Sequence, residues 1–506
     1  MLIGGTYMID TVKIGIVCDV HLTDRKESPQ YAFLKLAAEQ MKKDGIHTVI
    51  CLGDITSRGN VAAWWLYREL FSEFEHYEVV GNWDAKNPAT RETIMRLAKR
   101  PVLSIGGRKL IGIHTPDGKI EQQDRDLLKM LKPGDILVMH HNIHTLEQKS
   151  GHWLLKLAIR VPITILHGHR HWDLFEKIGS SRVFGMRGLD PDKAVGGFPA
   201  INYLTISEGD VTLQTTPFPL PKAYLEDTAR FFGLSCVDNQ LDISYATEHN
   251  VKYVELRCNG TQWKPDMTLL PALEAWRKKT DGYLSIHMPN LHYMDGQLCG
   301  QEQWMAALEY AVALKADSLT IHPPRASISA MENGGPVWKQ FLELYVAAAK
   351  AVPASMKIGI ENLHRRNGEP LDETRGFGYL PEEVSSWIDA INEALGECRV
   401  GHVLDVGHAQ INGTFAGLYP LSTWYQSMGQ KTVAYHIHQV IANDVKTVDH
   451  SAIENWFGPK INYTGFFYAW HVGILKHAPV FLEVKGHKNF EKSIAAFQKM
   501  LEEVAV

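Results

Sequence analysis

Short apolar runs, each followed by a polar cluster, repeat along the first half of this 506-residue chain. Runs of this length that are rich in Val and Ile predict strands buried on both faces. We expect such strands at KIGIVCD (13–19), TVICLGD (48–54), YEVVGN (77–82), KLIGIH (109–114), DILVMHH (135–141) and PITILHGH (162–169). Helical patterns such as YAFLKLAAEQMKK (31–43) and ETIMRLAKR (92–100) fall between them. This alternation predicts a stacked α/β fold.

The first half ends in a predicted hairpin and a proline-rich connector. The runs INYLTIS (201–207) and DVTLQTT (210–216) have the pattern of paired strands, and PFPLPK (217–222) follows them. Three prolines in so few residues make a stiff, non-helical segment. We therefore expect an N-terminal domain over 10–216, a linker over 217–228 and a second domain over 229–506.

The second half contains eight further apolar runs that alternate with helical patterns such as WMAALEYAVALKA (304–316) and WKQFLELYVAAAKAV (338–352). The expected strands are FFGLSCV (231–237), VKYVELR (251–257), YLSIH (283–287), SLTIH (318–322), KIGIE (357–361), GHVLD (401–405), TVAYHIH (432–438) and PVFLEV (479–484). Eight strands with helices between them predict a (β/α)8 barrel. The fold class is therefore α/β in both domains.

Composition narrows the class of protein. Hydrophobic residues make up 45% and charged residues 22%, as in ordinary globular proteins. The net charge of -5 and the lack of a Lys/Arg block argue against a nucleic-acid partner. Six scattered cysteines without a C-x-x-C pair predict reduced thiols and a cytoplasmic location. The N-terminal run lacks the features of a signal peptide, and no run approaches a membrane span.

Most strand ends of the first half carry a residue that can bind a metal. These residues are Asp19 and His21, Asp54, Asn82, His140, and His169 with His171. Two pairs are spaced by two residues, so on an extended segment both side chains point the same way. Oxygen and imidazole ligands in this mixture suit Mn, Fe or Zn.

The order D-x-H … G-D … G-N-x-D … H … G-H-x-H resembles that of the calcineurin-like metallophosphoesterases, over about residues 10–215. The resemblance implies two divalent ions and hydrolysis of a phosphoester. It also implies that Asp54 bridges the ions. The implied ligands are Asp19, His21, Asp54 and His171 for one ion, and Asp54, Asn82, His140 and His169 for the other.

One position departs from that pattern. The family usually has a histidine after the G-N asparagine, where it helps to protonate the leaving group, but this chain has Trp83. Indole cannot supply a proton at neutral pH. Three hypotheses follow: the substrate has a good leaving group such as a phosphate, another histidine (His114 or His141) donates the proton, or the domain is weakly active or only binds.

Six successive strands of the expected barrel end in or near a residue of metal-ligand type, the end at which barrel active sites are built. These residues are His287, His322, Glu361, Asp405, His436 and Glu483. The stretches SIHMPN, TIHPP, GIENLH, LDVGHA, YHIH and FLEVKG resemble the xylose isomerase-like barrel superfamily, which includes sugar isomerases, 3-epimerases and apurinic-site endonucleases.

That resemblance leaves two ligand sets open, with one to three ions of Mn or Zn. As in the epimerases, one ion would be held by Glu361, Asp405, His436 and Glu483. The two glutamates would also exchange protons with the substrate carbon next to a carbonyl. Adding His287, His322, His408 and a ligand from Asp449–His450 would resemble the three-metal endonucleases. Those enzymes usually show D-x-H at the last site, whereas Asp449 and His450 are adjacent.

The combined prediction is a bifunctional metal-dependent enzyme. The first domain would cut a phosphoester of a small, sugar-containing metabolite, and the barrel would isomerise, epimerise or further cleave it. Trp83, Arg365 and Lys485 are assigned to substrate binding, and Arg366 and Lys488 are nearby cations of the same kind. The alternatives are a nucleic-acid processing phosphodiesterase and a protein in which one domain is a non-catalytic scaffold.

Overall fold

The computed structural model describes residues 11–207, 210–258, 263–332, 334–365, 369, 374–442 and 447–504. The chain forms two compact units. Unit 1 contains Met1–Pro219 and the separate segment Phe457–Gly465, and unit 2 contains Leu220–Trp456 and Phe466–Val506. The residues expected to form a linker, 217–228, include most of a helix, α6 (Lys222–Ala229). Among the helices of the described ranges, none is long and apolar enough to cross a membrane.

Unit 1 contains two sheets. The first has the order β11-β10-β1-β2-β3 and the second has the order β4-β5-β6-β7-β9-β8. The strands of the first sheet are β1 (Val12–Val17), β2 (Thr48–Cys51), β3 (Glu75–Glu78), β10 (Ala200–Ile206) and β11 (Val211–Pro217). Those of the second are β4 (Val102–Ile105), β5 (Arg108–Gly112), β6 (Ile136–Met139), β7 (Thr164–His167), β8 (Leu174–Ile178) and β9 (Ser181–Gly185).

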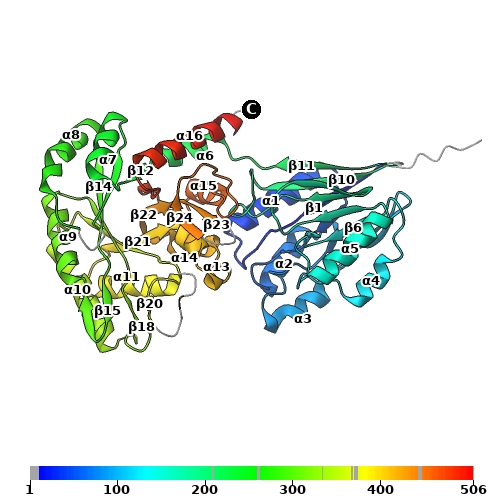
Figure 1. The fold of residues 1–506 in the computed structure, drawn as a ribbon, viewed down its shortest axis with the longest axis horizontal. Helices are drawn as coiled ribbons and strands as arrows, with labels where there is room; N and C mark the ends of the chain where they lie inside the picture. The colour runs from blue at the N-terminus through cyan, green and yellow to red at the C-terminus, as the bar shows by residue number, and fades with distance from the viewer. Residues whose placement is uncertain are drawn as a thin grey trace, which may run out of the picture. The chain divides into compact units, whose positions relative to one another are not determined.

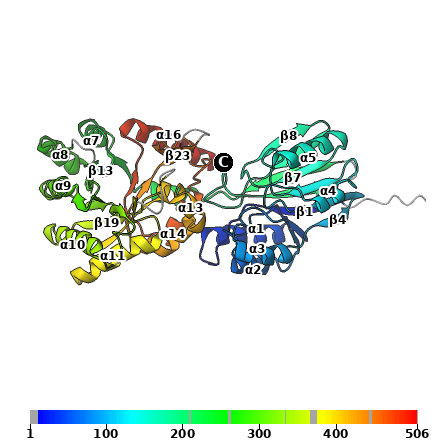
Figure 2. The same ribbon diagram turned by 60° about the horizontal axis from the view of Figure 1, so that its bottom comes forward.

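A continuous apolar core fills the space between the two sheets of unit 1. Ile16 and Ile50 of the first sheet and Val138 and Leu166 of the second belong to one buried cluster. A second cluster joins the other face of β5, β6 and β7 to two helices. Figure 2 shows helices on both sides of the strands. The helices are α1 (Pro29–Lys43), α2 (Val61–Leu70), α3 (Pro88–Leu97), α4 (Gln122–Leu128) and α5 (Gln148–Arg160). The expected α/β sandwich is therefore present.

Unit 2 is a closed barrel of eight parallel strands in the order β12-β13-β14-β17-β19-β21-β22-β25. The strands are β12 (Phe232–Ser235), β13 (Tyr253–Arg257), β14 (Tyr283–His287), β17 (Ser318–Ile321), β19 (Lys357–Glu361), β21 (Val400–Asp405), β22 (Thr432–Ile437) and β25 (Val480–Leu482). All eight fall within the runs predicted from the sequence, apart from one added residue at the start of β21. The (β/α)8 barrel is confirmed.

Helices surround the barrel strands (Figure 1). The longer ones are α7 (Asn239–Glu248), α8 (Leu270–Thr280), α9 (Gln301–Ala313), α10 (Pro336–Ala351), α11 (Pro381–Leu395) and α16 (His487–Val504). Shorter helices are α12 (Val406–Gln410), α13 (Thr414–Leu418), α14 (Leu421–Met428) and α15 (Thr464–His471), with 3-10 turns at Met267–Leu269 and Gly429–Lys431. Two small sheets were not predicted: β15 (His292–Met294), β16 (Gln297–Cys299), β18 (Arg325–Ser327) and β20 (Thr374–Gly376), and the pair β23 (Gln439–Ala442) and β24 (Thr447–Ser451).

Candidate metal centres

The first group of candidate ligands in unit 1 lies where β1 and β7 end. Asp19 and His21 follow β1, and His171 follows β7. Nε2 of His171 lies 3.4 Å from Oδ1 of Asp19. One ligand atom from each of the three residues lies within 4.8 Å of the others, so a single ion could contact all three.

The second group comes from the ends of β2, β6 and β7. Nε2 of His140 lies 3.2 Å from Oδ2 of Asp54, and His169 completes the group. Asn82, which follows β3, has its side-chain oxygen 3.1 Å from Nε2 of His140 and 3.0 Å from Nδ1 of His169. Four loops therefore bring these side chains to one point.

Asp54 connects the two groups. Its Oδ2 lies 3.5 Å from Nε2 of His21 and 3.2 Å from Nε2 of His140. A carboxylate in this position is within reach of both groups. The structure thus brings together all seven residues that the sequence singled out in unit 1.

Several of these residues have an unusual backbone. Their φ angles lie in the left-handed region: Asp19 (51°), His21 (51°), Asp54 (53°), His169 (69°) and His171 (62°). Such a conformation costs about 1–3 kcal/mol at a residue other than glycine, and it persists where the surroundings demand it. The strain is concentrated at residues that aim an oxygen or an imidazole into the centre.

In the buried cluster of unit 1, the carboxylates and the imidazoles stabilise each other's charged forms. Burial disfavours the ionised carboxyl of Asp54, but His140 and His21 outweigh that effect and hold its pKa well below the usual value. Burial likewise opposes protonation of His140, yet Asp54 and Asp19 raise its pKa to about 9. An acceptor-rich centre that attracts protons this strongly also attracts cations, since both compete for the same lone pairs.

Asp84, to which the sequence analysis gave no role, anchors the loops that carry Asp54 and Asn82. Its Oδ1 accepts the N–H of Thr56 at 2.8 Å, and its Oδ2 accepts the N–H of Gly81 at 3.1 Å. Burial and the nearby charge of Asp54 raise the pKa of Asp84 to about 6. A side chain at position 81 would collide with the carboxylate of Asp54, because a Cβ there would lie 2.3 Å from its Oδ1.

Trp83 lies at the edge of the first group. Its main-chain N–H donates to Oδ1 of Asp54 at 2.8 Å, and its ring meets His21 edge-on with 6.2 Å between centroids. The ammonium of Lys193 lies 5.0 Å from the Trp83 ring centroid. Trp83 therefore lies next to the first group of candidate ligands. Its indole offers an apolar face there, and the nearby cation is the ammonium of Lys193.

The two histidines proposed as alternative proton donors have different surroundings. The ring of His141 lies 4.3 Å from that of His169 and 5.1 Å from that of His140, between centroids. Burial, assisted by these two histidines, lowers the pKa of His141 to about 3. His114 lines a separate cavity of about 100 Å³ with Arg100, and its Nδ1 accepts the N–H of Val80 at 3.0 Å.

In unit 2, imidazoles converge on Glu361. Nε2 of His322 lies 2.9 Å and Nε2 of His287 lies 3.2 Å from its Oε2. Nδ1 of His436 lies 3.3 Å and Nδ1 of His408 lies 3.4 Å from its Oε1. The carboxylate of Glu361 is thus enclosed by four histidines from four different elements.

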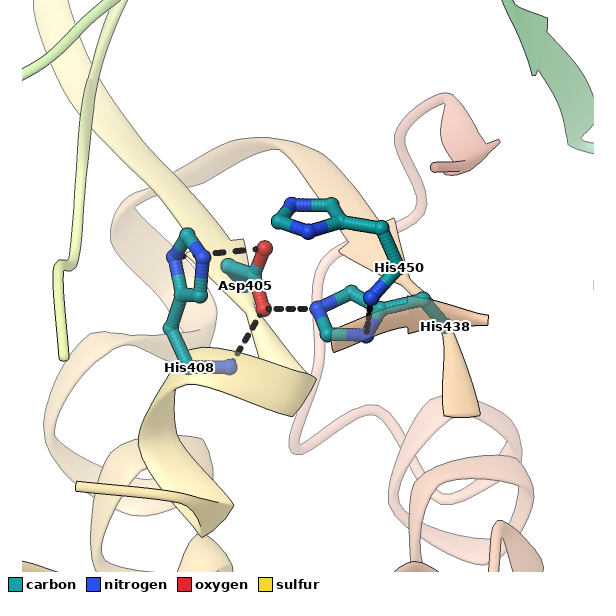
Figure 3. A group of neighbouring side chains, drawn as sticks. All are labelled: Asp405, His408, His438 and His450. Atoms are coloured by element: carbon teal, nitrogen blue, oxygen red, sulfur yellow. Dashed lines mark hydrogen bonds and ion pairs between the residues drawn. The ribbon is translucent and has the colours of Figure 1, made fainter. Parts of the chain in front are cut away.

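Two further groups of residues that could bind a metal include Glu361 or lie next to it. Glu361, Asp405, His436 and Glu483 form one, and Asp405, His408, His438 and His450 form the other (Figure 3). Nε2 of His450 lies 3.2 Å from Oε2 of Glu483. Each barrel residue predicted as a metal ligand therefore lies in or against one connected cluster, and His438 is an addition to the prediction.

Glu255 and Arg257 of β13 were also missed. Oε1 of Glu255 lies 3.1 Å from Nε2 of His436, and both side chains are fully buried. The guanidinium of Arg257 forms an ion pair with Glu483. A carboxylate in the apolar strand VKYVELR was the available signal, because a buried charge needs a partner.

The residues assigned to substrate binding in the barrel take different positions. Lys485 lines a cavity of about 510 Å³ together with Arg257 and His450. The guanidinium of Arg365 donates to the main-chain oxygen of Glu369 at 2.9 Å, so it holds its own loop. Arg366 lies outside the described residues. A second cavity, of about 350 Å³, is lined by residues that include His322, Arg325, His364, His408, His450 and Glu483.

Buried atoms without a hydrogen-bond partner test whether metal ions fit these clusters. Within the described residues, such atoms include both ring nitrogens of His21, Nε2 of His287, Oε1 of Glu361, Oδ2 of Asp405, Nδ1 of His436 and Oε2 of Glu483, each of which lies 3.2–3.5 Å from an oppositely charged group without making a hydrogen bond of good geometry. A buried polar atom left unsatisfied costs about 1–3 kcal/mol. Cations bound to these lone pairs would remove that cost, so the donor sets fit divalent ions in both units.

Comparison with known proteins agrees with both folds. The profile of the xylose isomerase-like TIM barrel family matches residues 243–503, and that of the calcineurin-like phosphoesterase superfamily domain matches residues 12–185. None of the curated proteins that were compared matches the chain.

Three solved structures illustrate the similarity. A D-tagatose 3-epimerase-like protein is 19% identical, with a TM-score of 0.39, 54% of this chain covered and 99% of that one. Endonuclease IV from Thermus thermophilus is 14% identical, with a TM-score of 0.37 and coverage of 54% and 99%. A dimetal phosphatase from Danio rerio is 12% identical, with a TM-score of 0.32 and coverage of 42% and 100%.

The barrel match extends over just over half of the chain, and the phosphoesterase match covers the strands that carry Asp19, Asp54 and His169. The chain therefore belongs to the xylose isomerase-like TIM barrel family and carries, ahead of the barrel, a domain of the calcineurin-like phosphoesterase superfamily.

Proposed function

We propose that unit 1 hydrolyses a phosphoester or phosphoanhydride of a small metabolite with the help of two divalent ions. The observation that carries the proposal is the position of Asp54, whose carboxylate lies between the His21 and His140 groups. Two ions held there would supply a nucleophile from water and neutralise charge on the phosphoryl oxygens. The chain's own residues hold and orient the reacting groups, and Asp84 fixes the loops that carry Asp54 and Asn82.

Trp83 shapes the substrate preference under this proposal. A leaving group with a high pKa needs a proton as its bond breaks, whereas a phosphate leaves without one. Neither indole nor the buried, neutral imidazole of His141 is a ready proton donor. We therefore infer that the substrate carries a good leaving group, such as a phosphate in an anhydride.

For the barrel, metal-dependent phosphoester cleavage is the candidate that the geometry favours over carbon epimerisation. Epimerisation by two glutamates requires Glu361 to reach a substrate carbon. Four imidazole nitrogens lie 2.9–3.4 Å from its two oxygens. Glu483 lines the cavity of about 350 Å³, and Glu361 is not among the described residues that line it. Glu361 is thus placed to hold ions, while Lys485 offers positive charge to an anionic substrate beside Arg257, whose guanidinium is paired with Glu483.

Hydrolysis of bis(p-nitrophenyl) phosphate in the presence of Mn²⁺ tests both assignments. We compare the wild type with Asp54→Asn and Glu361→Gln, after confirming by circular dichroism that each variant is folded. Second-sphere changes at metal sites already cost about 10- to 100-fold in activity, so loss of a ligand should cost about 100-fold or more.

The two variants separate the units. Loss of hydrolysis with Asp54→Asn alone supports unit 1 as the phosphodiesterase and leaves the barrel with another reaction. Loss with Glu361→Gln alone overturns the proposal for unit 1 and assigns the cleavage to the barrel. Unchanged rates in both variants contradict both assignments.

A further inference from the structure

The side chain of Lys193 lies at the rim of the candidate metal centre of unit 1, beside Trp83. Its ammonium is 5.0 Å from the centroid of the Trp83 ring and 3.9 Å from Oδ2 of Asp190. The same oxygen of Asp190 lies 3.3 Å from Nδ1 of His21, one of the candidate ligands. The side chain of Lys193 is only 20% exposed. A positive charge is therefore held next to the first ligand group and is partly shielded from water.

The loop that carries Lys193 is attached to the centre through its backbone. The main-chain oxygen of Lys193 lies 3.2 Å from Nδ1 of His171, and the N–H of Val195 donates to the carbonyl of His171 at 2.9 Å. At the start of the loop, the N–H of Asp190 donates to the carbonyl of Asp19 at 3.0 Å. These bonds fix the place from which the lysine side chain extends. They do not use that side chain, so it can be replaced without removing them.

The ammonium of Lys193 has no close partner in the protein. The nearest carboxylate is that of Asp190, whose Oδ1 accepts the side-chain amide of Gln30 at 2.9 Å and the N–H of Asp192 at 3.0 Å. At 3.9 Å from Oδ2 of Asp190, the ammonium is beyond hydrogen-bond distance, and it donates no hydrogen bond within the described part of the chain. Withdrawing a charge from water without a hydrogen bond is costly, and an anion bound here would offset that cost.

An ammonium at this rim suits a second phosphate of the substrate. In hydrolysis of a phosphoanhydride, a water oxygen forms a bond to one phosphorus, and the bond from that phosphorus to the bridging oxygen breaks. The bridging oxygen keeps the electron pair and leaves as part of the second phosphate, while the protons of the water pass to the products and the solvent. Negative charge therefore grows on the second phosphate, and a cation beside it stabilises the transition state more than the bound substrate.

The neighbouring indole agrees with a leaving group that departs as an anion. An alkoxide needs a proton as its bond breaks, and Trp83 cannot supply one. A phosphate needs no proton but is stabilised by a cation. Lys86 also lies near the ring, 5.7 Å from its centroid, but its side chain is exposed and solvent screens its charge. Lys193 is therefore the better placed of the two cations.

We propose that Lys193 binds the leaving phosphate of a phosphoanhydride substrate and stabilises its charge as the bond to the bridging oxygen breaks. The inference rests on the hydrolytic function proposed for unit 1, and it narrows the substrate class to phosphoanhydrides.

Substrates with and without a second phosphate test the role of Lys193. Inorganic pyrophosphate and ADP carry one, whereas bis(p-nitrophenyl) phosphate has a good leaving group but no second phosphate. We compare the Asp54-dependent steady-state rates of the wild type, Lys193→Gln and Lys193→Arg at saturating Mn²⁺. We expect Lys193→Gln to lower kcat for the anhydrides about 100-fold and for the nitrophenyl ester less than about threefold. The KM for the anhydrides should change less than kcat. Lys193→Arg keeps the charge and should recover most of the rate.

Lys35→Gln, at a 60% exposed position of α1, is the matched control and should behave as the wild type with every substrate. Equal losses with the ester and the anhydrides in Lys193→Gln would indicate general damage to the centre and would overturn the inference. Unchanged rates in Lys193→Gln, or no recovery in Lys193→Arg, would overturn it too. Asp54-dependent cleavage of the ester but of neither anhydride by the wild type would overturn this inference alone. No Asp54-dependent cleavage of any of the three would overturn the function proposed for unit 1 and this inference with it.

Discussion

Trp83 lies beside the carboxylate of Asp54, at the position where the calcineurin-like pattern has a histidine. Its main-chain N–H donates to Asp54 at 2.8 Å, so the backbone at this position is tied to the centre whatever side chain it bears. The side chain alone is therefore free to vary, and the change from imidazole to indole alters the available proton donors without altering the ligands.

A Trp83→His variant tests that interpretation. Positioned proton donors contribute about 10²- to 10⁴-fold to steps that need a proton. We expect the ratio of alkyl-phosphoester hydrolysis to p-nitrophenyl-ester hydrolysis to rise about tenfold or more in this variant. Steady-state rates with both substrates at saturating Mn²⁺ measure the ratio.

Trp83→Phe is the matched control, because it removes the indole and adds no proton donor. Its ratio should stay at the wild-type value. An unchanged ratio in Trp83→His would mean that the leaving group receives its proton elsewhere, and His141, with its ring 4.3 Å from that of His169, would then be the residue to replace.

The sequence predicts individual candidate metal ligands at the ends of strands, but it does not predict the residues that hydrogen-bond to those ligands or pair with them. Asp19, Asp54 and His140 follow apolar runs directly, and such residues meet at one edge of a parallel sheet. Glu255 lies inside an apolar run rather than after it, and its partner His436 is 181 residues away along the chain. His438 lies two residues after His436 and was not singled out, although its ring packs so closely on Gly407 that a Cβ there would lie 2.2 Å from it.

Strand burial explains which elements were predictable. The barrel strands β12, β17 and β21 are buried along their whole length, and such strands produce unbroken apolar runs. By contrast, β4 and β8 alternate between more and less exposed residues, and neither was predicted. A short alternating strand resembles a polar loop unless its neighbour in the sheet is known.

Strand β21 carries a buried histidine that is absent from the candidate ligand groups. His402 is fully buried and its ring is stacked on Trp424 of α14, with 5.8 Å between centroids. Burial lowers the pKa of His402 to about 3, although Glu361 opposes the shift. Because an unfolded histidine has a pKa of about 6.5, the unfolded chain binds this proton first as pH falls. Stability from His402 is therefore complete above about pH 6.5 and is lost on acidification.

We predict that His402→Phe makes unfolding less sensitive to acid. Between pH 7.5 and pH 5 the wild type should lose about 2 kcal/mol that the variant retains, since each pKa unit corresponds to about 1.4 kcal/mol. Urea unfolding of EDTA-treated proteins at the two pH values measures the difference. His249→Phe, at an exposed position, serves as the control. Parallel losses in His402→Phe and the wild type would contradict the assignment.

In the whole molecule, the two compact units do not coincide with two continuous stretches of the sequence. The proline-rich segment placed the predicted boundary at 216, close to the observed division after Pro219. The segment Phe457–Gly465, from the second half of the chain, nevertheless belongs to unit 1. No local pattern predicts this, because the contacts join residues 265 and 268 positions apart.

Asn462 is the central residue of that segment. It is fully buried, and its side-chain amide donates to the carbonyls of Ala194 at 2.6 Å and Gly197 at 3.0 Å. The same loop reaches the first group of candidate ligands, because the main-chain oxygen of Lys193 lies 3.2 Å from Nδ1 of His171. Asn462 thus supports a loop that positions a candidate metal ligand.

We predict that Asn462→Ala exposes this loop and weakens metal retention in unit 1. Two buried carbonyls lose their donor, and each such loss costs about 1–3 kcal/mol. Tryptic cleavage after Lys193, which is 20% exposed in the folded protein, should become faster, and the variant should retain less Mn²⁺ after dialysis. Glu454→Ala, at a 72% exposed position shortly before the segment, is the control and should behave as the wild type.

An N-terminal fragment ending at Pro219 carries the argument further, because it contains every candidate ligand of unit 1 but lacks Phe457–Gly465. Its free energy of unfolding should fall below that of unit 1 in the full chain, and cleavage after Lys193 should match that of Asn462→Ala. If the fragment protects Lys193 and holds Mn²⁺ as the full chain does, the loop is stable by itself. The contacts of Asn462 would then contribute nothing to the stability of the loop that carries Lys193 or to metal binding near His171. Unit 1 would fold without the segment Phe457–Gly465.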